Sequence, residues 1–358
     1  MPELNRRAIV QRGYVWAALL SLLICQMCWC DGEHTGASET AFEPVQWGPV
    51  CLLRGQHRLI DVLADSLMDG ASQDRQRAAF ALGQIGGVAV EHVLFEALQD
   101  SDRQVRLHVA LALAQCGRKE GYPGAEAAFY EGPEWVKYYA IYGMCRADRA
   151  ACLRLLQQHP VSGSPFLSRI ISQAQQYPPA DWPPREPYGG LLEWCDWQQA
   201  LEFAAEAMVA EADIWFHAGD YEQVIRCNEA ALFLQPSWVD VYSNSGWLLW
   251  SMNRHGAAVE VYRKAIQANP DSWEAHFELG YYYLLQGHAR LAIQYLKRAV
   301  DLDAPPIRAR SYAHALERSG RLEEARDFWR QLEAVDDSGV VTNNLQRLEE
   351  ILSTPGRR

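Results

Sequence analysis

The segment Arg75-Gln-Arg-Ala-Ala-Phe-Ala-Leu-Gly-Gln-Ile-Gly86 returns 31 residues later as Arg106-Leu-His-Val-Ala-Leu-Ala-Leu-Ala-Gln-Cys-Gly117. In each copy, alanine and larger aliphatic residues recur at a helical spacing and form one apolar stripe. Turn-forming residues at 69–70, 100–101 and 131–133 recur at the same offset. Each period of 31 residues is therefore predicted to contain two helices, separated from the next pair by a turn.

A single helix pair cannot bury such a stripe, whereas stacked pairs bury it in a continuous solenoid core. The sequence resembles HEAT-like repeats, particularly the short kind also seen in bilin lyases. The resemblance is carried by Arg75-x-x-Ala78-Ala79-x-Ala81-Leu82-Gly83-x-Ile85-Gly86 and Val105-Arg106. It covers residues 57–176. The third unit departs from the pattern, because Tyr138, Tyr139 and Tyr142 stand where small residues are expected.

In the second half the period becomes 34 residues, as shown by Ala231, Ala265 and Ala299. The turn inside each unit is assigned to Gly219, Asn253, Gly287 and Gly320. The segment 273–283 with the alanines and prolines after it resembles a tetratricopeptide (TPR) unit. We expect TPR repeats over residues 200–352, ending in a closing helix. The predicted fold is all-α: two helical-repeat solenoids, HEAT-like and then TPR, joined by a Pro-rich linker.

The linker is predicted over residues 177–199, which contain Tyr177-Pro-Pro, Trp182-Pro-Pro and Pro187-Tyr-Gly-Gly. Proline lacks a backbone N–H and restricts the residue before it, so no helix propagates through this stretch. The prolines suggest a stiff spacer, and its tryptophans would pack against a neighbouring block more readily than remain in water.

The N-terminal residues 1–30 have the pattern of a secretory signal peptide. Arg6, Arg7 and Arg12 precede an apolar run of about a dozen residues, which is shorter than the ~20 needed to cross a bilayer. Cleavage after Cys30 is preferred, and a twin-arginine signal, a lipoprotein signal and an uncleaved anchor remain open. Residues 31–56 form an N-terminal extension. The sequence therefore predicts export to the periplasm or the extracellular space, with possible membrane anchoring.

The charge balance disfavours nucleic acid and anionic lipid as partners. The chain has a net charge of −12, and removal of residues 1–30 leaves 30 basic and 44 acidic side chains, near −14. Such a chain repels phosphate backbones. Of the six cysteines after residue 30, the interpretation as buried apolar residues suits Cys116, Cys145 and Cys227 and is favoured over disulfides, although the chain is expected to meet an oxidising compartment.

No motif for catalysis is visible in the sequence. It contains no nucleophile elbow, no phosphate-binding glycine loop and no His-Glu-x-x-His pair, and its ten histidines are scattered. We therefore predict no enzymatic activity, no cofactor and no metal.

The candidate partner-binding residues follow from the TPR resemblance, because in that family the first helix of each unit lines a concave groove. The groove positions here are rich in aromatic and acidic side chains. They are Asp213, Phe216, Asp240, Trp247, Trp250, Phe277, Tyr281, Arg310 and His314, with Glu206, Val209, His217, Ser243, Glu274 and Arg318 beside them. Four aromatic residues, Trp247, Trp250, Phe277 and Tyr281, are expected to form one platform. The lysines and asparagines of the family's carboxylate clamp are missing there.

The sequence thus favours a non-catalytic scaffold or adaptor of the cell envelope that binds other proteins or peptide segments. Two alternatives stay open. The resemblance to bilin lyases implies a lyase-like enzyme or its accessory subunit, which a bound chromophore would reveal. The third interpretation is a rigid structural component of an envelope assembly.

Overall fold

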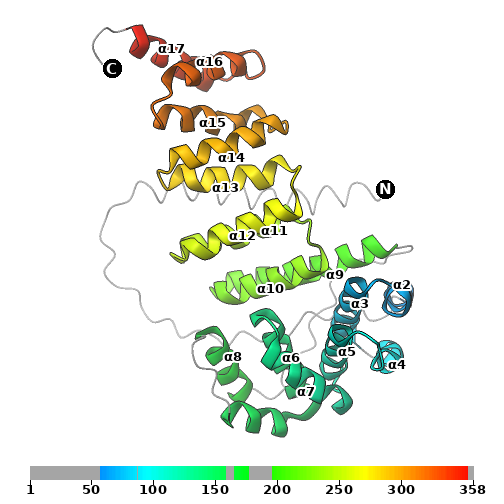
Figure 1. The fold of residues 1–358 in the computed structure, drawn as a ribbon. Coiled ribbons are helices and arrows are strands. Elements are labelled where there is room, and N and C mark those ends of the chain that lie inside the picture. Colours follow the sequence, from blue (N-terminus) through cyan, green and yellow to red (C-terminus); the bar gives the residue numbers. More distant parts are fainter. Residues whose placement is uncertain (1–56, 87, 159–164, 177–195, 354–358) are drawn as a thin grey trace. The chain divides into compact units, whose positions relative to one another are not determined.

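The computed structural model describes residues 57–353 apart from 87, 159–164 and 177–195 (Figure 1). Within these ranges the regular elements are helices and none is a strand, which confirms the all-α prediction. The predicted signal peptide, the N-terminal extension and most of the linker lie outside the described residues.

The HEAT-like repeats have the helix boundaries that the turn residues predict. The helices are α2 (His57–Asp69), α3 (Ser72–Ile85), α4 (Val88–Ala97), α5 (Arg103–Gln115), α6 (Tyr122–Glu131), α7 (Glu134–Gln158) and α8 (Pro165–Gln176), with a 3-10 turn at Lys119–Gly121. The breaks after α2, α4 and α6 coincide with the recurring turns of the sequence. Successive first helices α3, α5 and α7 pack side by side.

Close approach of α3 and α5 explains the small residues of the repeat. A Cβ added at Gly83 would lie 2.8 Å from the Cα of Ala112. One residue further on, the buried amide of Gln84 donates to Oε1 of Gln115 at 3.3 Å. Gln84 and Gln115 are 31 residues apart, so the same repeat position is joined across neighbouring units.

The third HEAT-like unit is folded from α7 alone, because this helix breaks at Asp148. The backbone there has φ −153° and ψ 91°, outside the helical region. The Asp148 carboxylate accepts a hydrogen bond from the N–H of Ala151 at 3.0 Å and so starts the second half.

The TPR repeats form four helix pairs and a closing helix. They are α9 (Trp197–His217), α10 (Tyr221–Leu234), α11 (Val239–Ser251), α12 (His255–Ala268), α13 (Trp273–Leu285), α14 (Ala289–Asp301), α15 (Pro306–Arg318), α16 (Leu322–Glu333) and α17 (Gly339–Ser353). All four predicted turn residues have positive φ, namely Gly219 74°, Asn253 62°, Gly287 76° and Gly320 84°. Glycine and asparagine tolerate this left-handed conformation better than other residues.

Helix α9 begins earlier than the expected boundary at residue 200. Asp196 accepts from the N–H of Gln199 at 2.8 Å, and the Gln199 side chain accepts from the N–H of Asp196 at 3.1 Å. This reciprocal pair is a capping box, which fixes the first turn of the helix.

Aromatic residues of the degenerate third unit pack against the first TPR pair. Tyr138 donates to Oε1 of the buried Glu211 at 3.1 Å, and Tyr139 donates to Sδ of Met208 at 3.2 Å. Both tyrosines lie on α7 and both acceptors on α9. The two tyrosines that replace small residues of the HEAT-like pattern thus contact the TPR repeats.

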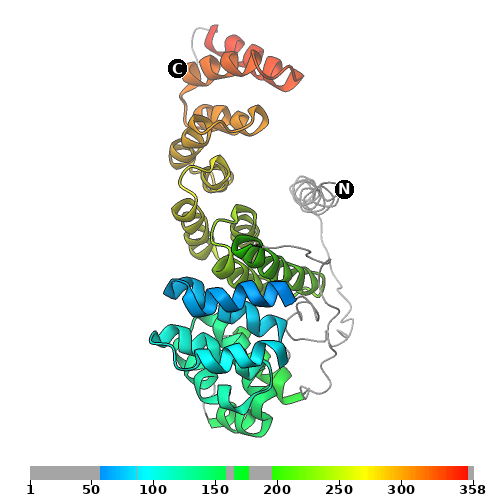
Figure 2. The same cartoon turned by 90° about the vertical axis from the view of Figure 1, so that its right-hand side faces the viewer.

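A second set of contacts centres on Phe233 of α10. Its ring lies 5.9 Å from Phe80 and 5.2 Å from Trp135, while its carbonyl accepts from Nε of Arg77 at 3.0 Å. Figures 1 and 2 both show α3 beside the start of the TPR repeats. We call the contacts of α3, α5 and α7 with α9 and α10 the junction.

An ion pair also crosses the junction. Arg226, on α10, is 6% exposed, and its guanidinium lies 2.5 Å from Oε2 of Glu134, on α7. The same guanidinium lies 2.8 Å from Glu229 and 3.5 Å from Glu222. Because this cation is buried, removal of Glu134 alone would leave it less well compensated, with only the carboxylates of α10 beside it.

Candidate partner-binding groove

The first helices of the second, third and fourth TPR units lie next to one another. Helix α13 packs against α11 and α15, the first helices of the neighbouring units, while the second helices approach one another less closely. The first helices therefore lie on the inner side of the stack, where the predicted groove positions fall.

Two of the predicted groove residues form a stacked aromatic pair on α13. The rings of Phe277 and Tyr281 lie 5.4 Å apart and nearly parallel, at 13°. Phe277 is buried, with 3% exposed, whereas Tyr281 is 37% exposed. The guanidinium of Arg308 lies 5.0 Å from the Phe277 ring centre, within the range of a cation–π contact. The Tyr281 ring therefore lies at the protein surface, and the buried Phe277 ring packs beneath it.

Acidic side chains of α11 and α13 lie near one another. Burial, opposed by Arg308 and reinforced by Asp240, raises the pKa of Glu278 to about 7. Desolvation, with a smaller effect from Glu274, also raises the pKa of Asp240. Three acidic side chains from α11 and α13 thus lie within electrostatic reach of one another, and a cation placed among them would favour their ionised forms.

Glu278 and Arg308 were missed by the sequence reasoning. Glu278 lies directly after the groove position Phe277, and Arg308 lies one TPR period of 34 residues after Glu274. The repeat period could therefore have identified Arg308, whereas the only signal for Glu278 was its charge on a groove helix.

The two tryptophans of α11 do not share one environment. The Trp250 ring meets Tyr282 edge to face, with centroids 5.9 Å apart at 87°, so it contributes to packing between α11 and α13. Trp247 is half-buried. Among the described ring contacts, those of Trp250 and of the Phe277–Tyr281 pair are separate. The single four-residue platform expected from the sequence is therefore divided into parts.

The candidate residues of α9 lie at its C-terminal end. Asp213 is exposed, and its Oδ1 lies 3.7 Å from Nε2 of His217. Phe216 is half-buried and packs at a tilt against Tyr221, with centroids 5.6 Å apart. These residues remain candidates for the edge of the groove.

The candidate residues of α15 are engaged within the chain. Arg310 donates to both carboxylate oxygens of Asp336, at 2.7 and 2.8 Å, and to Oγ of Ser338 at 2.7 Å. His314 meets Trp329 edge to face at 5.1 Å, and burial lowers its pKa. Both side chains thus hold α15 against the helices that follow.

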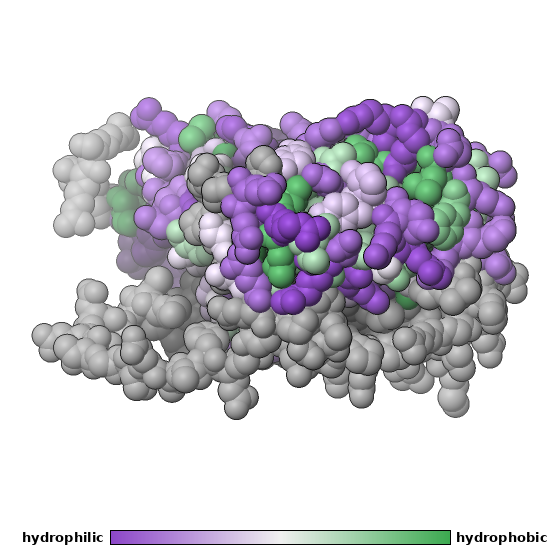
Figure 3. Space-filling model, turned by 90° about the horizontal axis from the view of Figure 1, so that it is seen from below, coloured by the Kyte–Doolittle hydropathy of each residue, from purple (hydrophilic) through white to green (hydrophobic). Residues whose placement is uncertain are grey.

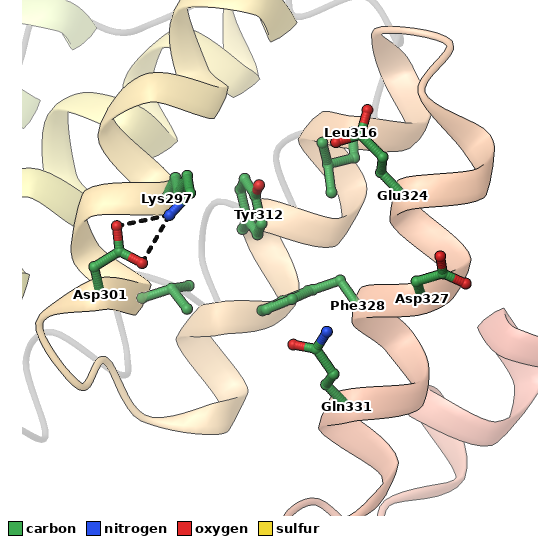
Figure 4. Close-up of a pocket in the computed structure, with 9 residues that line it drawn as sticks. Lys297, Asp301, Tyr312, Leu316, Glu324, Asp327, Phe328 and Gln331 are labelled. Atoms are coloured by element: carbon green, nitrogen blue, oxygen red, sulfur yellow. Dashed lines mark hydrogen bonds and ion pairs between the residues drawn. The ribbon is translucent and has the colours of Figure 1, made fainter.

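A separate hollow lies between α14, α15 and α16 (Figure 4). Its volume is about 330 Å³, and Tyr312 and Phe328 meet edge to face in its wall, 4.9 Å apart. At one side, Nζ of Lys297 lies 2.8 Å from both carboxylate oxygens of Asp301. Two of its three helices are second helices of their units, so the hollow is distinct from the groove.

Seen from below, the molecular surface is mostly hydrophilic, with hydrophobic side chains in small separate patches (Figure 3). In the part of the chain that the structure describes, no helix is long and apolar enough to cross a membrane. In that same part, no group of three or more His, Cys, Asp or Glu side chains is arranged to hold a metal ion.

Comparison with protein families supports both repeat types. Residues 59–145 match HEAT repeats, and residues 244–306 match the tetratricopeptide repeat family. The chain is therefore a protein with HEAT-like and TPR repeats. Such stacked repeats create extended concave surfaces that typically serve to bind other proteins.

Known proteins resemble parts of the chain. A stretch of 99 residues is 31% identical to BBSome complex member BBS4 of Bos taurus and covers 27% of this chain and 17% of that protein. Among solved structures, MamA is 20% identical with a TM-score of 0.31, covering 38% of this chain and 78% of its own. Yeast Tom70 is 12% identical with a TM-score of 0.37, covering 82% of this chain and 62% of its own.

Proposed function

We propose that this protein is a non-catalytic scaffold or adaptor of the cell envelope that holds a segment of a partner protein in its TPR groove. The observation that carries the proposal is the exposed Tyr281, supported by buried Phe277, on a helix whose Glu274 and Glu278 lie within electrostatic reach of Asp240. Exposed aromatic side chains with rigid support commonly supply most of the binding energy at protein interfaces.

The chemistry of the groove favours a partner segment with an apolar anchor next to lysine or arginine. The anchor would contact Tyr281 and the half-buried Trp247, while its cationic group would meet the carboxylates. The chain's net charge of −12 would speed the encounter with a basic partner. The segment is extended or helical, as both forms are known to bind along grooves.

The envelope location rests on the predicted signal peptide of residues 1–30. The junction supports a scaffold in which the HEAT-like and TPR blocks are held in one arrangement, because Arg226 of the TPR block pairs with Glu134 of the HEAT-like block. This observation also favours the structural alternative, in which rigidity itself is the function. The lyase-like alternative predicts visible absorbance of the purified protein by a bound chromophore.

The proposal is tested by panning the immobilised full chain against a random peptide library. We expect enriched peptides to combine an aromatic or aliphatic residue with lysine or arginine. The variant with Trp247→Ala and Tyr281→Ala should bind them at least tenfold more weakly, a loss of about 1.4 kcal/mol. Trp250 is left in place because its packing on Tyr282 would be lost with it.

The matched control is Tyr130→Ala, which removes an aromatic side chain that is 47% exposed on α6, outside the groove. It should bind the peptides as the wild type does. Enrichment of acidic peptides, or equal binding by the double variant with a native circular dichroism spectrum, would contradict the proposal.

A further inference from the structure

Two buried cysteines face each other across the break in α7. Cys145 lies in the first half of the helix and Cys152 in the second, with 2% and 0% of their surfaces exposed. Their Sγ atoms are 2.8 Å apart. The sequence reasoning favoured Cys145 as a buried apolar residue and did not single out Cys152 as its neighbour.

This separation is unusually short for two sulfur atoms that are not bonded. Even the smaller carbon atoms make their best contacts at about 3.5–4.0 Å. A disulfide bond is about 2.0 Å long. A side-chain rotation that moves either sulfur by less than an ångström would therefore bring the two atoms to bonding distance. The turn that brings the two half-helices together is held by the hydrogen bond that Asp148 accepts from the N–H of Ala151.

The surroundings limit when such a bond can form. The hydrogen bond to Cys145, burial and charge repulsion together raise the pKa of the Cys152 thiol. The thiolate is the reactive form in disulfide exchange, so Cys152 attacks slowly in the folded protein, and burial shields both sulfurs from an external oxidant. Oxidation must therefore take place during folding, before the pair is buried.

We propose that Cys145 and Cys152 form a disulfide bond as the chain folds in an oxidising compartment. The oxidant is a disulfide, either that of an oxidised protein or that of oxidised glutathione. One cysteine thiolate attacks it and releases one thiol, which leaves a mixed disulfide. The second cysteine then attacks that mixed disulfide, releases the second thiol and completes the bond. Two cysteine thiols are oxidised and one disulfide is reduced to two thiols.

The bond would join the two halves of α7, a helix that makes several of the junction contacts. The same α7 helix presents Tyr138 and Tyr139 to α9 and Glu134 to Arg226. Joining its two halves restricts the unfolded chain around Asp148 and stabilises this unit. This inference goes beyond partner binding, and it fails or succeeds independently of the groove.

The experiment uses the full chain, reduced in denaturant and then refolded in a mixture of reduced and oxidised glutathione. Free thiols are blocked with N-ethylmaleimide in acid, and the protein is digested with trypsin without reduction. Arg146 and Arg149 separate the two cysteines, so the bond appears as residues 138–146 linked to 150–154. The same digest is made of protein secreted by a host with an oxidising export compartment.

We expect the linked peptides in both samples, and a melting temperature that falls by a few degrees when the wild type is reduced. The variant with Cys145→Ala and Cys152→Ala should fold and show no such dependence on reductant. The single variant Cys152→Ala should leave Cys145 blocked by N-ethylmaleimide. Recovery of both wild-type cysteines as blocked thiols, or their linkage to other cysteines, in natively folded protein from both sources overturns the proposal.

Discussion

The imidazole of His108 stacks on the ring of Phe233, with centroids 5.1 Å apart and planes 8° from parallel. His108 belongs to α5 of the HEAT-like repeats and Phe233 to α10 of the TPR repeats. The junction is therefore built from side chains that are 125 positions apart in the sequence. We expect it to couple the unfolding of the two repeat blocks.

Phe233→Ala is expected to destabilise the protein by about 2–4 kcal/mol, because it removes ring contacts with Phe80, Trp135 and His108. Urea unfolding should change from one transition to two, as the blocks lose their coupling. Phe95→Ala is the control, since this phenylalanine is 37% exposed on α4 and should cost much less. Equal losses for both variants would count against the junction.

The pH dependence of the junction follows from His108. Burial lowers its pKa below the 6.5 of the unfolded chain. The unfolded state thus binds a proton more readily, so stability is present above pH 6.5 and is lost as the pH falls below it. The Phe233 ring and the Gln104 carbonyl, 2.9 Å from Nδ1, are its neighbours.

This dependence is measured by urea unfolding of the wild type and His108→Gln between pH 7.5 and 5. As the pH decreases, the free energy of unfolding of the wild type should fall relative to that of His108→Gln. A difference that stays constant over this range would show that His108 does not titrate in this way.

The sequence predicted those features that depend on local backbone chemistry. The turns at Gly219, Asn253, Gly287 and Gly320 could be found because a left-handed residue is required wherever the repeat turns. The break in α7 at Asp148 could not, because no glycine or proline marks it. Tyr138 and Tyr139 were recognised as departures from the repeat, but their partners on α9 lie about 70 residues away.

The repeat period predicts which helices carry the candidate groove residues, but not the contacts that these side chains make. The 34-residue period correctly assigns Phe277 and Tyr281 to one face of α13, but it does not determine which ring covers the other. Arg310 falls at a groove position, yet it pairs with Asp336 because the connection between α16 and α17 returns beside it. Such a contact depends on tertiary structure that no periodicity contains.

Cleavage of the linker should leave the two blocks associated. A protease site inserted between residues 180 and 190 would give two fragments, each ending outside the junction. Because Arg226 and Phe233 contact α3 and α7, the fragments should migrate as one species in size-exclusion chromatography. The same nick in the Phe233→Ala protein should release them at lower urea concentrations. Immediate separation of the wild-type fragments would show that the linker alone joins the blocks.

Glu278→Gln is expected to stabilise the protein at pH 8 and to have little effect near pH 4. The folded pKa of this acid, about 7, lies above the ordinary value of 4.5, so the folded state retains a proton that the unfolded state gives up. Stability is therefore fully present below pH 4.5 and is lost as the pH rises through 7. The gain at pH 8 is at most about 3 kcal/mol, because 1 pKa unit corresponds to about 1.36 kcal/mol and partial exposure reduces it.

Glu324→Gln provides the control with the opposite sign. Hydrogen bonding to Arg321 lowers the pKa of Glu324, so its substitution should destabilise at neutral pH and not in acid. Urea unfolding of the three proteins at pH 4 and pH 8 separates the two effects. If Glu278→Gln stabilises equally at both values, its benefit does not arise from the proton. If it stabilises only at pH 8, the groove carries a carboxyl group whose ionisation a bound lysine or arginine would promote, and such a partner should then bind more tightly at pH 8 than at pH 6.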